Sequence, residues 1–132
     1  MNPLLSNLIR GLMGLTLAGV GAAPALADPA VLNLYSARHY STDEALYANF
    51  TKATGIRIQR VDADDAGILA RLKTEGSSSP ADVVLLVDAS RLWRAQVDGL
   101  FLPIKSPVLD AAIPAALRDP KGNWFGLSMR AR

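Results

Sequence analysis

Short apolar runs alternate with amphipathic segments along most of this chain. Strand candidates lie at residues 31–35, 56–61 and 82–87. Segments with helical periodicity lie between and after them, at 41–54, 64–75 and 89–98. The run IRIQRV alternates apolar and polar residues, as in a strand with one covered face. The run DVVLLV is mostly apolar without alternation, which is typical of a strand buried on both faces. This order of elements predicts right-handed crossovers and a doubly wound α/β fold with a mainly parallel sheet.

Each of the three predicted helices presents one apolar stripe. The first opens with Ser41-x-x-Glu44, which matches a capping box, and Gly55 is expected to end it. The residues expected to face the core are Leu46, Tyr47 and Phe50 in the first helix, Ile68, Leu69 and Leu72 in the second, and Trp93, Val97 and Leu100 in the third.

The C-terminal third of the chain has a weaker pattern. Residues 103–120 contain four prolines, and they predict an irregular stretch with one helical turn around 108–117. The segment WFGLSM at 124–129 is predicted as a further strand. Because no capping segment follows before Arg132, we expect the chain to be the N-terminal part of a larger protein, or the product of a truncated reading frame.

The first 27 residues have the three parts of a secretory signal. A short segment with one basic residue, Arg10, precedes the apolar stretch GLMGLTLAGVGAA, and a small-x-small ending closes at Ala27. A membrane anchor is the alternative, but a span needs about 20 apolar residues, and this run is shorter and broken by Pro24. We therefore expect cleavage after Ala27, which leaves an incomplete α/β lobe at residues 28–132 with no stable membrane insertion.

Charge and cysteine content narrow the class of protein. Loss of residues 1–27 leaves 13 basic against 12 acidic residues, with no cluster of lysine and arginine that would indicate nucleic acid or an anionic membrane as partner. The chain has no cysteine, which excludes a disulfide framework, a thiolate metal site and a lipid-modified cysteine after the signal. These features together predict a soluble periplasmic protein.

Candidate chemistry lies at the end of the first predicted strand, in YSARHYS at 35–41. In an open α/β sheet ligands bind outside the carboxyl ends of the strands, and His39, the only histidine, stands there beside Tyr40. Phenolate is a hard oxygen donor that suits a hard cation, although a free phenol has a pKa of about 10 and needs the cation to ionise it at neutral pH. Imidazole can complete a mixed nitrogen and oxygen set. His39 and Tyr40 are therefore candidate metal ligands.

The same residues could instead have purely structural roles. A His-Tyr pair in a loop is often a capping or packing pair, and Tyr35 and Tyr47 are predicted to pack rather than to bind. Arg38 and Arg130 could balance anionic oxygens near the metal, or could bind a small anion together with helix amides, or could be ordinary surface arginines.

An enzyme is a further alternative. A hydrolase would need a nucleophile, a base and an orienting acid, and Ser36 and Ser41 are close to His39 in the sequence. No G-x-S-x-G or metal-hydrolase signature is present, so the sequence favours a protein without enzymatic activity.

Three stretches resemble the ferric-iron-binding periplasmic proteins that serve ABC importers. They are NLYSARHYSTDEALYANFTKATGI, PADVVLLVDASRLWRAQVDGLFLPI and WFGLSMRAR, and the likeness covers nearly all of residues 31–132. The resemblance implies one lobe of a two-lobe, type II periplasmic-binding fold, with ferric ion as cargo in the cleft between the lobes. It also implies an inner-membrane ABC permease as partner. Of the site residues, Tyr40 matches a ligand tyrosine, His39 a neighbouring histidine and Arg130 an arginine beside the ligand shell.

The resemblance is incomplete in one respect. The second-lobe tyrosines of that family have no counterpart before the chain ends at Arg132, and one tyrosine with one histidine cannot fill a six-coordinate shell. We therefore expect capture of Fe(3+) by a periplasmic substrate-binding component, with a synergistic anion as an open question. The alternatives are a protein of the same fold that binds a small anion or another solute, and a truncated fragment without function.

Overall fold

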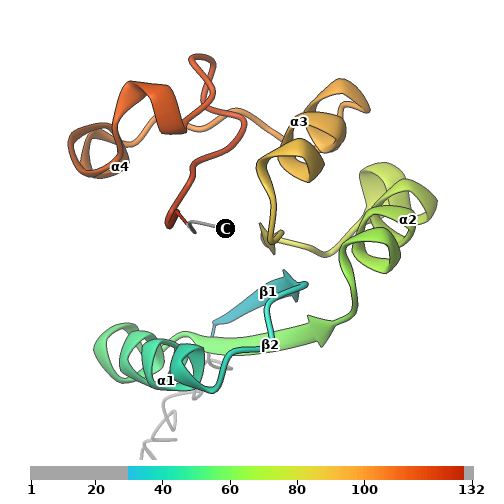
Figure 1. Cartoon of the computed structure of the whole chain (residues 1–132). Coiled ribbons are helices and arrows are strands. Elements are labelled where there is room, and N and C mark those ends of the chain that lie inside the picture. The colour runs from blue at the N-terminus through green and yellow to red at the C-terminus, as the bar shows by residue number, and fades with distance from the viewer. Residues whose placement is uncertain (1–29, 130–132) are drawn as a thin grey trace, which may run out of the picture.

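A computed structural model of the chain describes residues 30–129. The predicted signal and its cleavage after Ala27, as well as Arg130, lie outside these residues. The strands are β1 (Val31–Ser36), β2 (Arg57–Asp62) and β3 (Val83–Leu85). The α-helices are α1 (Ser41–Thr54), α2 (Asp65–Glu75), α3 (Ala89–Val97) and α4 (Pro107–Ala112), and short 3-10 turns, η1 and η2, lie at Gly76–Ser78 and Ala115–Leu117 (Figure 1).

The three strands form one parallel sheet in the order β2-β1-β3. β1 is central: its Leu34 stands opposite Arg60 of β2 and Val83 of β3. The chain moves from β1 to β2 in one direction and from β2 to β3 in the other, and α1 and α2 lie on opposite sides of the sheet (Figure 1). The predicted α/β fold with a mainly parallel sheet is therefore confirmed, and the strand order reverses between β1 and β3.

The core lies between β1 and α2. Tyr35, Ile68 and Leu72 are almost fully buried there, and Leu100 packs against them. The hydroxyl of Tyr35 donates to the two carboxylate oxygens of Glu75 at 2.9 and 3.0 Å, so its polar end is satisfied at the edge of the core. The predicted apolar stripe of α2 and the packing role of Tyr35 are both confirmed.

The N-terminus of α1 differs from the prediction. Tyr40 occupies the N-cap position without a side-chain capping bond, and Ser41 is already helical, so the predicted capping box does not form. The carboxylate of Glu44 instead accepts a hydrogen bond from Arg60 of β2 at 2.6 Å. No residue of α1 is buried, and Leu46 is 64% exposed, so the predicted core face is wrong at that position.

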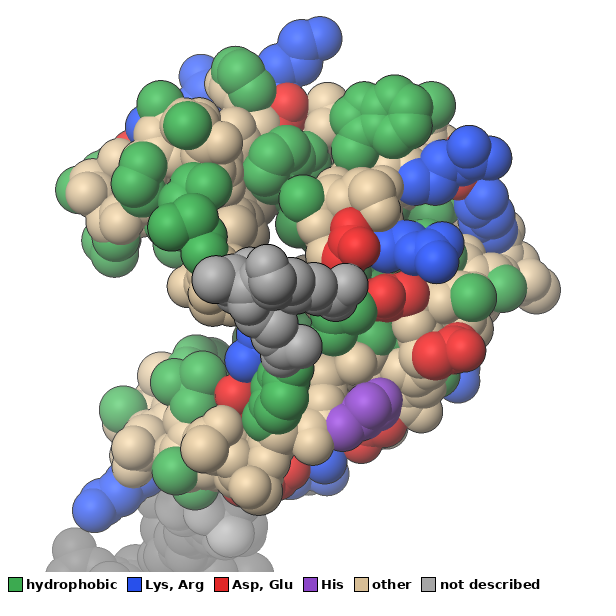
Figure 2. All heavy atoms as spheres, viewed as in Figure 1, with side chains coloured by type: hydrophobic (Ala, Val, Ile, Leu, Met, Phe, Trp, Pro, Cys, Tyr) green, Lys and Arg blue, Asp and Glu red, His purple; other side chains and the backbone are tan. Residues whose placement is uncertain are grey.

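The predicted apolar stripe of the third helix faces the core only at Leu100, which follows α3 and packs against the core cluster. Trp93 and Val97 are more than half exposed, whereas Ala95 is the buried residue of this helix. The small side chain of Ala95 lets the opposite face of the helix approach the rest of the protein, and apolar side chains gather on the surface over α3 and α4 (Figure 2). Among residues 30–129, no helix is long and apolar enough to cross a membrane.

The last two predicted strands are shorter or absent. β3 comprises only three residues of the run 82–87, and it pairs with β1 alone among the described strands, so Val83 is 39% exposed rather than buried on both faces. Residues 124–129 form no strand, only an isolated antiparallel bridge between Arg118 and Phe125. Their backbone bonds to the end of η2 and to the loop after it: Gly126 N donates to Leu117 O, and Trp124 O accepts from Asp119 N. The helical turn expected around 108–117 is confirmed by α4 and η2.

A buried carboxylate holds this C-terminal loop against α3. Asp119 accepts hydrogen bonds from the side chain of Gln96 and from both the backbone and the side chain of Asn123. The indole of Trp124 donates to the same Gln96 at 2.7 Å. Burial is the largest single effect and raises the pKa of Asp119, but the hydrogen bonds to its charged form from Asn123, Gln96 and the backbone of Lys121 together keep this pKa below its ordinary value.

Two leucine substitutions test this assignment of the core. Leu72→Ala should lower the free energy of unfolding by about 2–5 kcal/mol, because Leu72 is 5% exposed and its truncation leaves a cavity. The same change at Leu46 should alter it by less than about 0.5 kcal/mol, because that side chain faces solvent. Urea unfolding followed by circular dichroism measures both, and equal losses would contradict the assignment.

A second prediction concerns the pH dependence of stability. The hydrogen bond from Ser79 lowers the pKa of Glu75, with help from Arg71 and Tyr35, so ionised Glu75 stabilises the folded state. This contribution is present above the unfolded pKa of about 4.3, and it is lost as the pH falls through the folded pKa. The difference in melting temperature between the wild type and Glu75→Gln should therefore be largest near neutral pH and should shrink in acid. A difference that stays constant from neutral pH down to strong acid would contradict this role.

Candidate metal centre

The loop between β1 and α1 is held rigidly at its start. Ser36 is fully buried, and its hydroxyl accepts from the backbone N of Arg38 at 3.1 Å and donates to the carbonyl of the same residue at 3.2 Å. Ala37 N donates to Leu85 O at 2.8 Å and extends the pairing of β1 with β3. The loop therefore leaves the sheet where the strand order reverses, which is the usual position of a ligand site in such folds.

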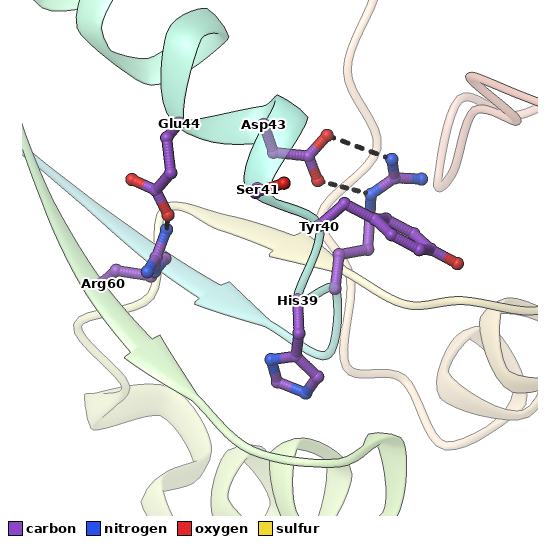
Figure 3. A pocket seen from close by; sticks show the side chains of 7 residues that line it. His39, Tyr40, Ser41, Asp43, Glu44 and Arg60 are labelled. Carbon is purple, nitrogen blue, oxygen red and sulfur yellow. Dashed lines mark hydrogen bonds and ion pairs between the residues drawn. The ribbon is translucent and has the colours of Figure 1, made fainter.

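His39 and Tyr40 follow on this loop and both are exposed. Tyr40 is 41% exposed and its carbonyl accepts from Asp43 N at 3.0 Å, which starts the first turn of α1. The two rings extend from the loop in different directions (Figure 3). The loop brings both predicted ligands to one region, but their side chains do not converge in this arrangement.

The loop and the first turn of α1 form an open hollow of about 320 Å³. Its lining residues are Arg38, His39, Tyr40, Ser41, Asp43, Glu44 and Arg60 (Figure 3). Both arginines are paired there: Arg38 Nε lies 3.0 Å from Asp43 Oδ2, and Arg60 contacts Glu44 at 2.6 Å and Asp62 at 2.7 Å. These three carboxylates outnumber the two guanidinium groups, so the five side chains carry no net positive charge.

The hydrogen bonds also stabilise the charged forms of both arginines. The bond to Asp43 raises the pKa of Arg38, and the bonds to Glu44 and then Asp62 raise the pKa of Arg60. Both groups therefore stay protonated, and the ion pairs persist wherever their carboxylates are ionised.

Each arginine also lies over an aromatic ring. The guanidinium carbon of Arg38 is 5.1 Å from the centre of the Tyr40 ring, and that of Arg60 is 5.5 Å from the centre of the Tyr47 ring. Both distances are within the range of a cation–π contact. The Tyr47 hydroxyl is buried, and no hydrogen-bond partner for it is found among the described residues. Tyr47 thus behaves as the predicted packing residue.

Asp43, Glu44 and Arg60 were not identified as site residues from the sequence. The two acidic residues carry a weak signal, because they fall in the first turn of the helix that follows Tyr40. Arg60 carries none, since it reaches the hollow only through the register of β2 on β1.

The donor set within the described residues is partial. No group of three or more histidine, cysteine, aspartate or glutamate side chains that could hold a metal ion occurs within residues 30–129. Tyr40 and His39 can supply one phenolate oxygen and one imidazole nitrogen, which suit a hard or borderline cation. The predicted role of Arg130 falls outside the described part of the chain.

Comparison with known proteins identifies relatives of this chain. The chain is 52% identical over 101 residues to iron uptake protein A1 of Synechocystis and 32% identical over 111 residues to the Fe(3+)-binding periplasmic protein of Serratia marcescens. The predicted resemblance to ferric-iron-binding proteins is confirmed. These alignments cover 76% and 84% of this chain but only 28% and 32% of the two relatives, so the chain spans about a third of their length.

A solved structure gives the same result for the fold. The chain matches a Trichodesmium protein that was solved in complex with iron and citrate ligands, with a TM-score of 0.70 and 50% sequence identity. The match covers 72% of this chain and 30% of that protein, which corresponds to part of a type II periplasmic-binding fold. No protein-family model matches the chain. The names of these relatives are those of uptake and binding proteins rather than of enzymes.

Proposed function

We propose that this chain is part of the periplasmic substrate-binding component of an ABC importer and that it contributes ligands for ferric iron. The observation that carries the proposal is the place of Tyr40. Tyr40 is the N-cap residue of α1, on the loop that leaves the carboxyl end of the central strand where the strand order reverses, which is the usual position of a ligand site in such folds.

The charges around the hollow favour a cation over an anion. An anion held by Arg38 would have to compete with Asp43, which already accepts from both Nε and Nη2 of that arginine. Arg60 is engaged in the same way by Glu44 and Asp62. Binding of a phosphate or sulfate here would require these pairs to break, whereas a cation meets no unpaired positive charge on these two residues.

We assign the metal-ligating roles to Tyr40 and His39, with rotation of one side chain needed before both can hold a single ion. The remaining ligands would come from outside residues 30–129, and a bound anion could fill part of the shell, as the iron and citrate in the Trichodesmium relative illustrate. We place Arg130 beside this shell by resemblance.

The proposed function also implies a cellular location and a partner protein. Cleavage after Ala27 would release the protein into the periplasm, where the Serratia relative is named as a periplasmic protein. An inner-membrane ABC permease would then receive the iron from the closed, loaded form.

Replacement of the proposed ligand tests the proposal. In the protein at its natural length, Tyr40→Phe should lower the affinity for ferric iron by at least about tenfold. It should also weaken the visible phenolate-to-iron charge-transfer band on titration with ferric citrate. Tyr47→Phe is the matched control, because that hydroxyl is buried and Tyr47 is not among the residues that line the hollow, so its removal should change neither quantity.

Two results would count against iron capture through Tyr40. One is a band and an affinity that survive Tyr40→Phe unchanged. The other is a rise in melting temperature with phosphate or sulfate that ferric iron does not increase further, since a ligand at a hundredfold excess over its dissociation constant stabilises by about 2.7 kcal/mol. The second result would favour the small-anion alternative.

A further inference from the structure

Arg38 is held from two independent directions. Its backbone is fixed by the buried hydroxyl of Ser36 at the end of β1. Its guanidinium is fixed by two hydrogen bonds to Asp43 on the first turn of α1, at 3.0 and 3.3 Å (Figure 3). The side chains of Arg38 and Asp43 are only 27% and 15% exposed, so solvent screens this pair less than a surface ion pair.

Tyr40 lies against the guanidinium held in this way. The Arg38 group is 5.1 Å from the centre of the Tyr40 ring, while Tyr40 itself is 41% exposed. A flat cation fixed against one face of a tyrosine ring restricts the rotamers that the ring can adopt. The planar guanidinium of arginine can stack on the ring in a set orientation, which the flexible ammonium group of lysine does not reproduce.

We infer that Arg38 and Asp43 act together as positioning residues for Tyr40 in ferric binding. Asp43 orients the guanidinium against the ring, and its negative charge cancels the positive charge that Arg38 would otherwise present to an approaching metal ion. This inference rests on the proposed function, because Tyr40 must be a ligand for its orientation to affect the metal.

The two parts of this role have different consequences. If Asp43 only shaped the loop, removal of Arg38 in addition would lower the affinity for ferric iron further. If Asp43 neutralises Arg38, removal of Arg38 as well should restore part of the affinity lost with Asp43, because the uncompensated positive charge disappears. The sign of this coupling separates an electrostatic role from a structural one.

The neighbouring residue provides a matched control. Glu44 also lines the hollow, and Glu44→Gln makes the same change in charge as Asp43→Asn. Its partner is Arg60, which lies over Tyr47 rather than over Tyr40. A general effect of charge on iron would appear in both variants, whereas positioning of Tyr40 would appear only with Asp43.

The first experiment uses the metal-free protein at its natural length. Tyrosines labelled with carbon-13 are followed by NMR, and the ring signals of Tyr40 are assigned by their loss in Tyr40→Phe. We expect Asp43→Asn and Arg38→Lys to shift these signals and Glu44→Gln to leave them in place. Unchanged Tyr40 signals in Asp43→Asn would overturn the inference, whether or not the protein binds iron.

The second experiment measures ferric affinity by competition with citrate. Asp43→Asn should weaken binding by about 10- to 100-fold, in the range known for residues that orient metal ligands. Glu44→Gln should weaken it by less than about fivefold, as for an exposed pair. The double variant Arg38→Gln with Asp43→Asn should bind more tightly than Asp43→Asn alone, and melting temperatures of the metal-free variants show that each one folds.

The outcomes distinguish this inference from the proposed function. Absence of iron binding by the wild type would reject the proposed function and, with it, the role of the pair in metal binding. Normal binding by the wild type with equal losses in Asp43→Asn and Glu44→Gln would overturn the positioning role alone. A double variant that binds more weakly than Asp43→Asn would overturn the proposal that Asp43 acts by cancelling the charge of Arg38.

Discussion

The pairing of β1 with a parallel strand on each side is the constraint on which the rest of this structure depends. β2 and β3 align along β1, and the bond from Ala37 N to Leu85 O extends the ladder beyond the last residue of the strand. The chain therefore leaves the sheet at one defined point, between two neighbours. Tyr35 faces the core just before this point and Tyr40 reaches the surface just after it.

The hollow beside Tyr40 combines a high density of charge with little net charge. Its two arginines are each neutralised by a carboxylate from a different element, so the ion pairs also connect the loop, α1 and β2. Such a surface neither attracts anions strongly nor repels cations, and it keeps the side chains around the phenol in defined orientations. The same contacts thus serve the local fold and the proposed chemistry.

The described part of the chain leaves much apolar surface uncovered. Trp93 and Val97 of α3 and Val108 of α4 are more than half exposed, and β3 has one neighbouring strand among the described residues (Figure 2). The core between β1 and α2 is small: among the described residues, its cluster has four buried members, and six partly buried hydrophobic residues pack against them. The relatives contain about three times as much chain as this match covers, which is consistent with the partial donor set at Tyr40 and His39.

The sequence by itself determined the alternation of strands and helices, the apolar stripe of α2 and the place of Tyr40 between a strand and a helix, because these depend on residues close together in the chain. Only the tertiary structure decided which face of α3 is buried, that Glu44 bonds to Arg60 sixteen residues away instead of capping its own helix, and that 124–129 bonds to a loop rather than to the sheet. Those choices depend on partners that the sheet register brings together, and local periodicity carries no information about that register.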